Sequence, residues 1–94
     1  MTSKDRSELK SYANSMESIG QVGKSGITDN LVKQTNDALE ARELIKITVL
    51  ETAPDSVNNI GIELSNKTNS ELVQAIGRKI ILYRKNEKES KYNI

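Results

Sequence analysis

The 94-residue sequence predicts a single α/β domain, a two-layer sandwich of helices on a four-stranded mixed sheet. Three segments carry apolar residues at helical spacing, and segments rich in β-branched residues lie between and after them. The last two strand segments are separated by only two residues. The order is therefore helix, strand, helix, strand, helix, strand, strand. Strands joined through a helix favour parallel pairing, and the terminal hairpin adds one antiparallel strand.

The first half of the chain contains two predicted helices and a short strand. The first helix is expected over residues 3–16, where apolar side chains recur at intervals of three and four. Those side chains are Leu9, Tyr12, Ala13 and Met16. A strand over residues 19–22 leads into a glycine-containing loop. Thr28 has a good N-cap side chain for a second helix, which runs to about residue 41.

The second half completes the sheet. Residues 43–50 predict a central strand, because apolar and β-branched residues occupy both of its faces. A third helix begins at Pro54–Ser56, and strands over 71–76 and 79–84 flank a turn at Gly77–Arg78. We expect the domain to cover residues 1–84 and the polar segment 85–94 to be a mobile tail. Tyr12 and Tyr83 are expected in the core, with no exposed aromatic cluster for base stacking.

The composition excludes several kinds of chemistry. The chain has no histidine and no cysteine, so it lacks disulfides, thiol or imidazole catalysis and the usual zinc sites. No apolar run is long enough to span a membrane, and no hydrophobic signal segment follows Met1. We therefore expect a cytoplasmic protein with no cofactor, no metal, no membrane partner and no small-molecule substrate.

The charge distribution is uneven although the net charge is only +1. Residues 1–26 carry +1, residues 27–72 carry −4 and residues 73–94 carry +4. Phosphate responds to the local field rather than to the total charge, so folding could still bring basic segments together.

The loop Gly23-Lys24-Ser25-Gly26 is the most informative motif. Two glycines at this spacing let the backbone approach a phosphate closely, and Lys24 supplies the opposite charge. A plain strand-to-helix turn can have the same glycine spacing, so the loop alone leaves both interpretations open.

Further blocks of sequence accompany this loop in a fixed order. They are Thr2–Arg6, Leu9–Lys10, Gln21–Thr28, Ala38–Ile47, Leu72–Lys79 and Leu82–Arg84. With these blocks the chain resembles the CRM domain (chloroplast RNA splicing and ribosome maturation), in the single-domain bacterial form of the YhbY-like proteins. It departs from the usual family pattern at Ser18, Ser25 and Lys85. These departures bear on loop geometry rather than on the fold.

The resemblance implies a non-catalytic RNA-binding protein that associates with ribosomal RNA or precursors of the large (50S) ribosomal subunit and acts in its assembly. It also implies a fold like the C-terminal domain of translation initiation factor three, with strand order 1-2-4-3 and the last strand antiparallel. The loop is similar to that of KH domains, which clamps an RNA backbone. In KH domains it joins two helices, so the resemblance does not imply a base-reading groove, and recognition is expected to rest on RNA backbone and shape.

The topology predicts one basic rim. Parallel strands end at the same edge, so the glycine loop and the Gly77–Arg78 turn should lie together, and the first helix should run back to place Lys4 and Arg6 beside them. The second helix begins there and adds unpaired N–H groups. In this prediction the glycines permit close approach, Lys24 contacts phosphate, and Ser25 and Thr28 donate hydrogen bonds. The expected RNA-binding residues are Lys4, Arg6, Lys10, Gly23, Lys24, Ser25, Gly26, Thr28, Arg78 and Lys79.

Plainer interpretations accompany these roles. Thr28 has a structural role as an N-cap, Arg78 and Lys79 are also typical of a solvated turn, and the basic residues of the first helix are typical of a solvated face. Arg42 and Lys46 are expected to pair locally with Glu40 or Glu43.

Two other functions compete with RNA binding by a monomer. The first is a protein-interaction module that recruits another assembly or translation factor through an acidic surface of Asp29, Asp37, Glu40 and Glu43. The second is an enzyme, which the lack of histidine, cysteine and a nucleophile elbow disfavours.

Overall fold

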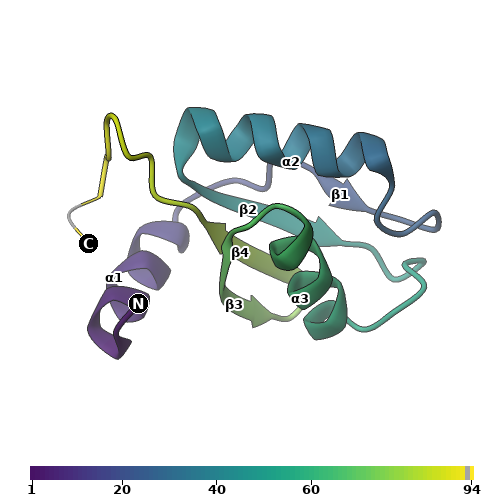
Figure 1. The fold of residues 1–94 in the computed structure, drawn as a ribbon. Helices are drawn as coiled ribbons and strands as arrows, with labels where there is room; N and C mark the ends of the chain where they lie inside the picture. Colours follow the sequence, from purple (N-terminus) through teal and green to yellow (C-terminus); the bar gives the residue numbers. More distant parts are fainter. Residues whose placement is uncertain (93) are drawn as a thin grey trace.

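The structure, a computed structural model, describes residues 1–92 and 94 (Figure 1). The elements are α1 (Ser3–Ala13), β1 (Gln21–Val22), α2 (Asp29–Arg42), β2 (Leu44–Val49), α3 (Val57–Lys67), β3 (Glu71–Ile76) and β4 (Lys79–Tyr83). The predicted α/β class and order of elements are confirmed, and the predicted hairpin turn lies between β3 and β4.

The four strands form one mixed sheet in the order β1-β2-β4-β3, the order that the family resemblance implied. β1 pairs with β2 in parallel, and β4 pairs with both β2 and β3 antiparallel. β1, β2 and β3 therefore run in one direction, and their carboxyl ends share one edge of the sheet. We call this the carboxyl edge.

Helices cover both faces of the sheet (Figure 1). α2 and α3 pack on one face over a core that includes Val22, Ile45, Ile47, Ile80 and Leu82. α1 packs on the other face, where its buried residues join a second cluster. That cluster contains Leu9, Ala13, Leu44, Val73, Ile81 and Tyr83. The two-layer sandwich formed by α2, α3 and the sheet thus gains a partial third layer.

Local hydrogen bonds explain where the helices begin. Thr2 and Asp5 form a capping box at α1, in which each side chain accepts from the other's backbone N–H. Thr28 caps α2 and Ser56 caps α3 through their hydroxyl oxygens. α1 ends at Ala13, which leaves residues 14–20 to connect it to β1.

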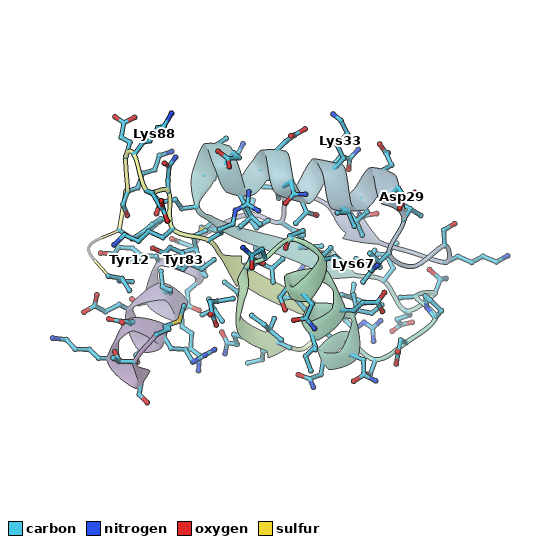
Figure 2. All side chains as sticks on the ribbon, in the orientation of Figure 1. Tyr12, Asp29, Lys33, Lys67, Tyr83 and Lys88 are labelled. Atoms are coloured by element: carbon cyan, nitrogen blue, oxygen red, sulfur yellow. The ribbon has the colours of Figure 1, made fainter. Side chains whose placement is uncertain are left out.

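The tail folds back on the α1 side of the sheet (Figure 2). The buried Glu43 carboxylate accepts hydrogen bonds from Ser90 Oγ, at 3.0 Å, and from the backbone N–H of Lys91. Tyr92 packs against Tyr12 and Tyr83, with ring centroids 5.2 and 6.2 Å apart. These contacts give the tail a docked position, while its expected mobility stays a prediction.

One prediction about the tyrosines is wrong. Tyr83 is buried as expected, but Tyr12 is 54% exposed. Helical spacing placed Tyr12 on the apolar stripe, whereas α1 turns only Leu9 and Ala13 fully into the core. All three tyrosines of the chain consequently meet in one partly exposed cluster.

Candidate functional site

The glycine loop is a four-residue turn with Lys24 and Ser25 exposed at its tip. The backbone N–H of Gly26 donates to the Gly23 carbonyl at 2.9 Å, which closes the turn. Gly26 has a φ of +68°, and a Cβ there would lie 3.0 Å from Pro54 Cγ. The fold therefore strongly favours glycine at position 26. At Gly23 an added Cβ would meet only ordinary contacts, the nearest being Leu50 Cδ1 at 3.6 Å.

The structure places the hairpin turn beside this loop at the carboxyl edge. Leu50 connects the two, because its N–H donates to the Val22 carbonyl at 2.9 Å and its carbonyl accepts from Arg78 Nη2. Arg78 Nε also donates to the Val49 carbonyl at 2.8 Å. The guanidinium of Arg78 thus has a structural role at the end of β2, and Arg78 also adds an exposed cation to the surface at the carboxyl edge.

Lys79 and Lys46 continue this surface onto the open part of the α1 face. Lys79 Nζ donates to Thr48 Oγ1 at 2.7 Å. Thr48 lies opposite Lys79 and Lys46 lies opposite Ile81, so both lysines are on the same face of neighbouring strands. The expected local ion pairs of Lys46 and Arg42 are not found among the described residues. Strand alternation of Leu44, Lys46 and Thr48 was the sequence signal that could have identified Lys46.

The expectation that α1 brings its basic residues to the carboxyl edge is wrong. Arg6 Nη1 donates to the carbonyls of Leu72 and Val73, at 2.7 and 2.9 Å, which lie at the start of β3. That is the opposite end of the strand from Arg78. α1 crosses the amino ends of the strands. The seven-residue connection to β1 is long enough for the helix to pack there. Lys4 and Lys10 belong to the same helix, so the three residues lie apart from Lys24.

Thr28 performs the structural role expected of it. Its Oγ1 accepts from the N–H of Leu31 at 3.1 Å, as an N-cap does. Its side chain is exposed beside the glycine loop.

Carboxylates also lie near the carboxyl edge. Glu51 and Asp55 are exposed in the connection between β2 and α3, and Asp29 is the first residue of α2. A hydrogen bond from the Asn59 amide, followed by one from the Ser56 N–H, lowers the pKa of Asp55 below its ordinary value. The edge is therefore mixed in charge, and its cations are Lys24, Arg78 and Lys79, with Lys46 further back along β2. We call these four residues the basic surface.

Two neighbouring hollows lie on the β1 side of α2, and the sequence analysis identified neither. A hollow of about 310 Å³ lies against the glycine loop and is lined by Gln21, Asn30 and Gln34 together with Lys24. A second, of about 500 Å³, shares Leu31 and Gln34 with the first. The three amide side chains lacked a motif that would have drawn attention to them.

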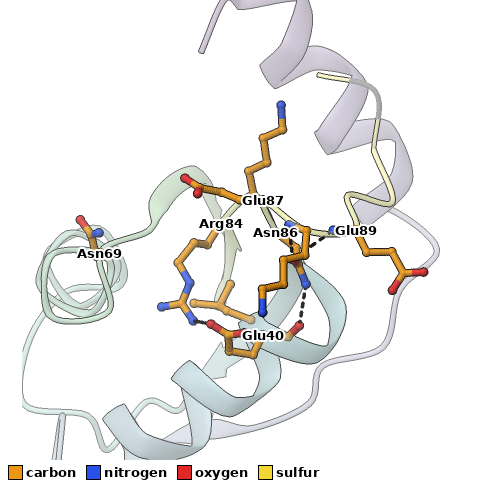
Figure 3. A pocket seen from close by; sticks show the side chains of 9 residues that line it. Glu40, Asn69, Arg84, Asn86, Glu87 and Glu89 are labelled. Carbon is orange, nitrogen blue, oxygen red and sulfur yellow. Dashed lines mark hydrogen bonds and ion pairs between the residues drawn. The ribbon is translucent and has the colours of Figure 1, made fainter.

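A further hollow of about 590 Å³ lies between the end of α2 and the tail (Figure 3). Some of its polar groups bond to one another or to neighbouring residues. Arg84 contacts Glu40 at 3.6 Å and donates to the Thr68 carbonyl and to Asn36, and Asn86 donates to the Glu40 carbonyl at 3.4 Å. Arg84 therefore ties α2 to the end of α3, and we assign the hollow no ligand.

The fold and the loop define a class of small α/β proteins that carry a Gly-x-x-Gly turn at the carboxyl edge of a four-stranded mixed sheet. The pattern of the CRS1 / YhbY (CRM) domain matches residues 1–84, and this chain belongs to that family. None of its described helices combines the length and the apolar character needed to cross a membrane.

Relatives span almost the whole chain. The probable RNA-binding protein YqeI of Bacillus subtilis is 45% identical over 93 residues, covering 99% of this chain and 93% of the relative. A probable RNA-binding protein of Pseudomonas aeruginosa is 30% identical, covering 97% and 88%. The solution structure of the hypothetical protein SAV1595 of Staphylococcus aureus matches with a TM-score of 0.79 and 45% identity, covering 100% of this chain and 94% of that one.

Proposed function

We propose that this chain is a non-catalytic RNA-binding protein that associates with ribosomal RNA in precursors of the large ribosomal subunit. In this role it acts as a cytoplasmic monomer in subunit assembly. The names of its relatives in two bacteria support RNA as the partner. Membership of the CRM family supports the connection with ribosome maturation.

The observation that carries the proposal is the meeting of the glycine loop with the basic surface around the end of β2. Lys24 is exposed at the tip of a turn whose glycines add no side-chain bulk. Lys46 and Lys79 project from one sheet face, and Arg78 donates to the carbonyls of Val49 and Leu50 at the end of β2. Cations distributed in this way match the spaced negative charges of an RNA backbone. Ser25 and Thr28 supply hydroxyl groups for phosphate oxygens.

The acidic surface that would support a protein-interaction module is less complete than the sequence suggested. Glu43 is only 1% exposed and its carboxylate is bonded to the tail. Asp37 pairs with Lys33 at 3.5 Å, and Glu40 contacts Arg84. The structure therefore favours RNA over an acidic protein interface.

Sedimentation of cell lysate through a sucrose gradient tests the proposal. We expect the wild-type protein to co-migrate with large-subunit precursors and a Lys24→Glu, Lys79→Glu variant to remain at the top. A Lys67→Glu, Lys88→Glu variant changes the net charge equally at exposed sites elsewhere and should still co-migrate (Figure 2). Wild-type protein at the top of the gradient would contradict the ribosomal role. Equal behaviour of both variants would contradict the assignment of the basic surface.

A further inference from the structure

Two neighbouring hollows lie between the edge strand β1 and the helix α2. The hollow beside the glycine loop and the hollow along α2 share Leu31 and Gln34 in their linings, so we treat them as one groove. The groove runs from Lys24 at the loop to Arg42 at the end of α2. With 1.5 Å of rise per residue, Asn30 and Arg42 are about 18 Å apart along the helix. This length can hold several nucleotides of an extended strand. We call it the β1–α2 groove.

The part of the groove beside the glycine loop is lined by amide side chains. Gln21 comes from β1, and Asn30 and Gln34 lie one turn apart on α2, all three exposed. Within the described part of the chain, none of these amides forms a hydrogen bond through its side chain. Each amide offers both a donor and an acceptor. That pair of groups is the chemistry that complements the edge of a nucleobase.

The remainder of the groove suits the other parts of a nucleotide. Lys24 at one end and Arg42 at the other are cations for phosphate groups. Between them, Ile19 is 38% exposed and lies with Ala38 in the second hollow, where the flat face of a base can pack. The acid in this hollow, Asp37, is paired with Lys33.

From this arrangement we propose that the β1–α2 groove binds a single-stranded segment of RNA and reads its bases through Gln21, Asn30 and Gln34. The major groove of double-stranded RNA is too deep and narrow for side chains to read, and sequence-specific recognition of RNA mostly targets unpaired bases. We therefore expect these amides to read single-stranded segments. The inference rests on the proposed function and adds base selectivity to it. It departs from the expectation that recognition uses backbone and shape alone.

Fluorescence anisotropy with labelled RNA tests the inference. The probes are single strands of about eight nucleotides of oligo-A, oligo-U or oligo-C, and a duplex of about 16 base pairs. We expect the wild type to bind single strands more tightly than the duplex and to prefer one base. Gln34→Ala should weaken binding of the preferred strand about tenfold and the other strands less. Lys24→Ala should weaken all strands by a similar factor.

Asn66→Ala is the matched control, because Asn66 is an exposed amide on α3 outside the groove. Alanine favours the helix at both positions, so both variants should fold. Equal affinities of Gln34→Ala and Asn66→Ala for every strand would overturn the inference, as would tighter binding of the duplex. Those results would leave the proposed function standing. Failure of the wild type to bind any RNA probe would also overturn the inference, while the sucrose-gradient experiment tests the proposed function independently.

Discussion

Gly23 and Gly26 differ in what the fold requires of them. Gly26 occupies the left-handed region at φ +68° and is packed against Pro54, whereas Gly23 needs neither positive φ nor extra space. The loop therefore depends on Gly26 for its shape. Gly23 instead keeps the loop surface free of a side chain, which matters for a ligand that approaches the backbone.

Replacing Gly26 by alanine should lower the free energy of unfolding by about 1 to 2 kcal/mol, because an L-residue is strained in the left-handed region. The close contact with Pro54 adds to this cost. Gly20→Ala is the control, since a Cβ at position 20 would meet nothing within 4 Å. Urea unfolding measures the free energy of unfolding of both variants. Equal midpoints for the two variants would show that the turn adapts without strain.

Ionisation of Tyr83 is expected to make the free energy of unfolding decrease at alkaline pH. Burial, followed by the charge of Glu43, raises the pKa of Tyr83 above its ordinary value of 10.0. The unfolded chain therefore loses the phenolic proton first. The stabilising contribution is fully present below pH 10.0 and is lost as the pH rises through the folded-state value. Between pH 9 and pH 11, the free energy of unfolding should decrease more steeply with pH for the wild type than for Tyr83→Phe. The same pH dependence of the free energy of unfolding in both proteins would contradict the role given to Tyr83.

At the scale of elements, the buried carboxylate of Glu43 makes several of the contacts that hold the tail on the body of the protein. Glu43 ends α2 with a φ of 64°, and its oxygens accept from Ser90, from the Lys91 N–H and, at 3.5 Å, from the Tyr83 hydroxyl. Tyr92 and Ile94 pack on the second core cluster beside them. The tail thus supplies two of the three hydrogen bonds that the Glu43 carboxylate accepts from the described residues.

Removing residues 85–94 should lower the free energy of unfolding by about 1 to 3 kcal/mol, because hydrogen bonds to a charged group are lost. Urea unfolding of the truncated and full-length chains measures the difference. Hydrogen exchange of the Lys91 amide gives an independent reading, since a docked tail protects it. Unchanged stability together with rapid exchange would support the mobile tail expected from the sequence.

At the scale of the whole molecule, periodicity and family resemblance predicted the order of elements and the strand order. Local patterns fix these features, such as the N-cap at Thr28 and the Gly77–Arg78 turn. The position of α1 could not be predicted in the same way. Its packing depends on which side chains find space on the sheet, so Arg6 reaches the start of β3 and Tyr12 meets the tail.

The candidate site was also predictable only in part. The glycine loop and the hairpin turn meet because parallel strands share an edge, which topology alone dictates. Lys46 and the amides of the β1–α2 groove come together through sheet register and helix packing instead. These depend on three-dimensional contacts that have no signature in a short motif.

The salt dependence of RNA affinity tests the central claim most directly. If Lys24 contacts phosphate, a plot of log affinity against log salt for a single-stranded RNA should be steep for the wild type. Lys24→Gln should reduce the slope by about 0.7, the value for one phosphate contact on a single strand. Lys67→Gln, the control on α3, should leave the slope unchanged. A slope near zero for the wild type, or equal slopes for the two variants, would contradict phosphate binding at the glycine loop.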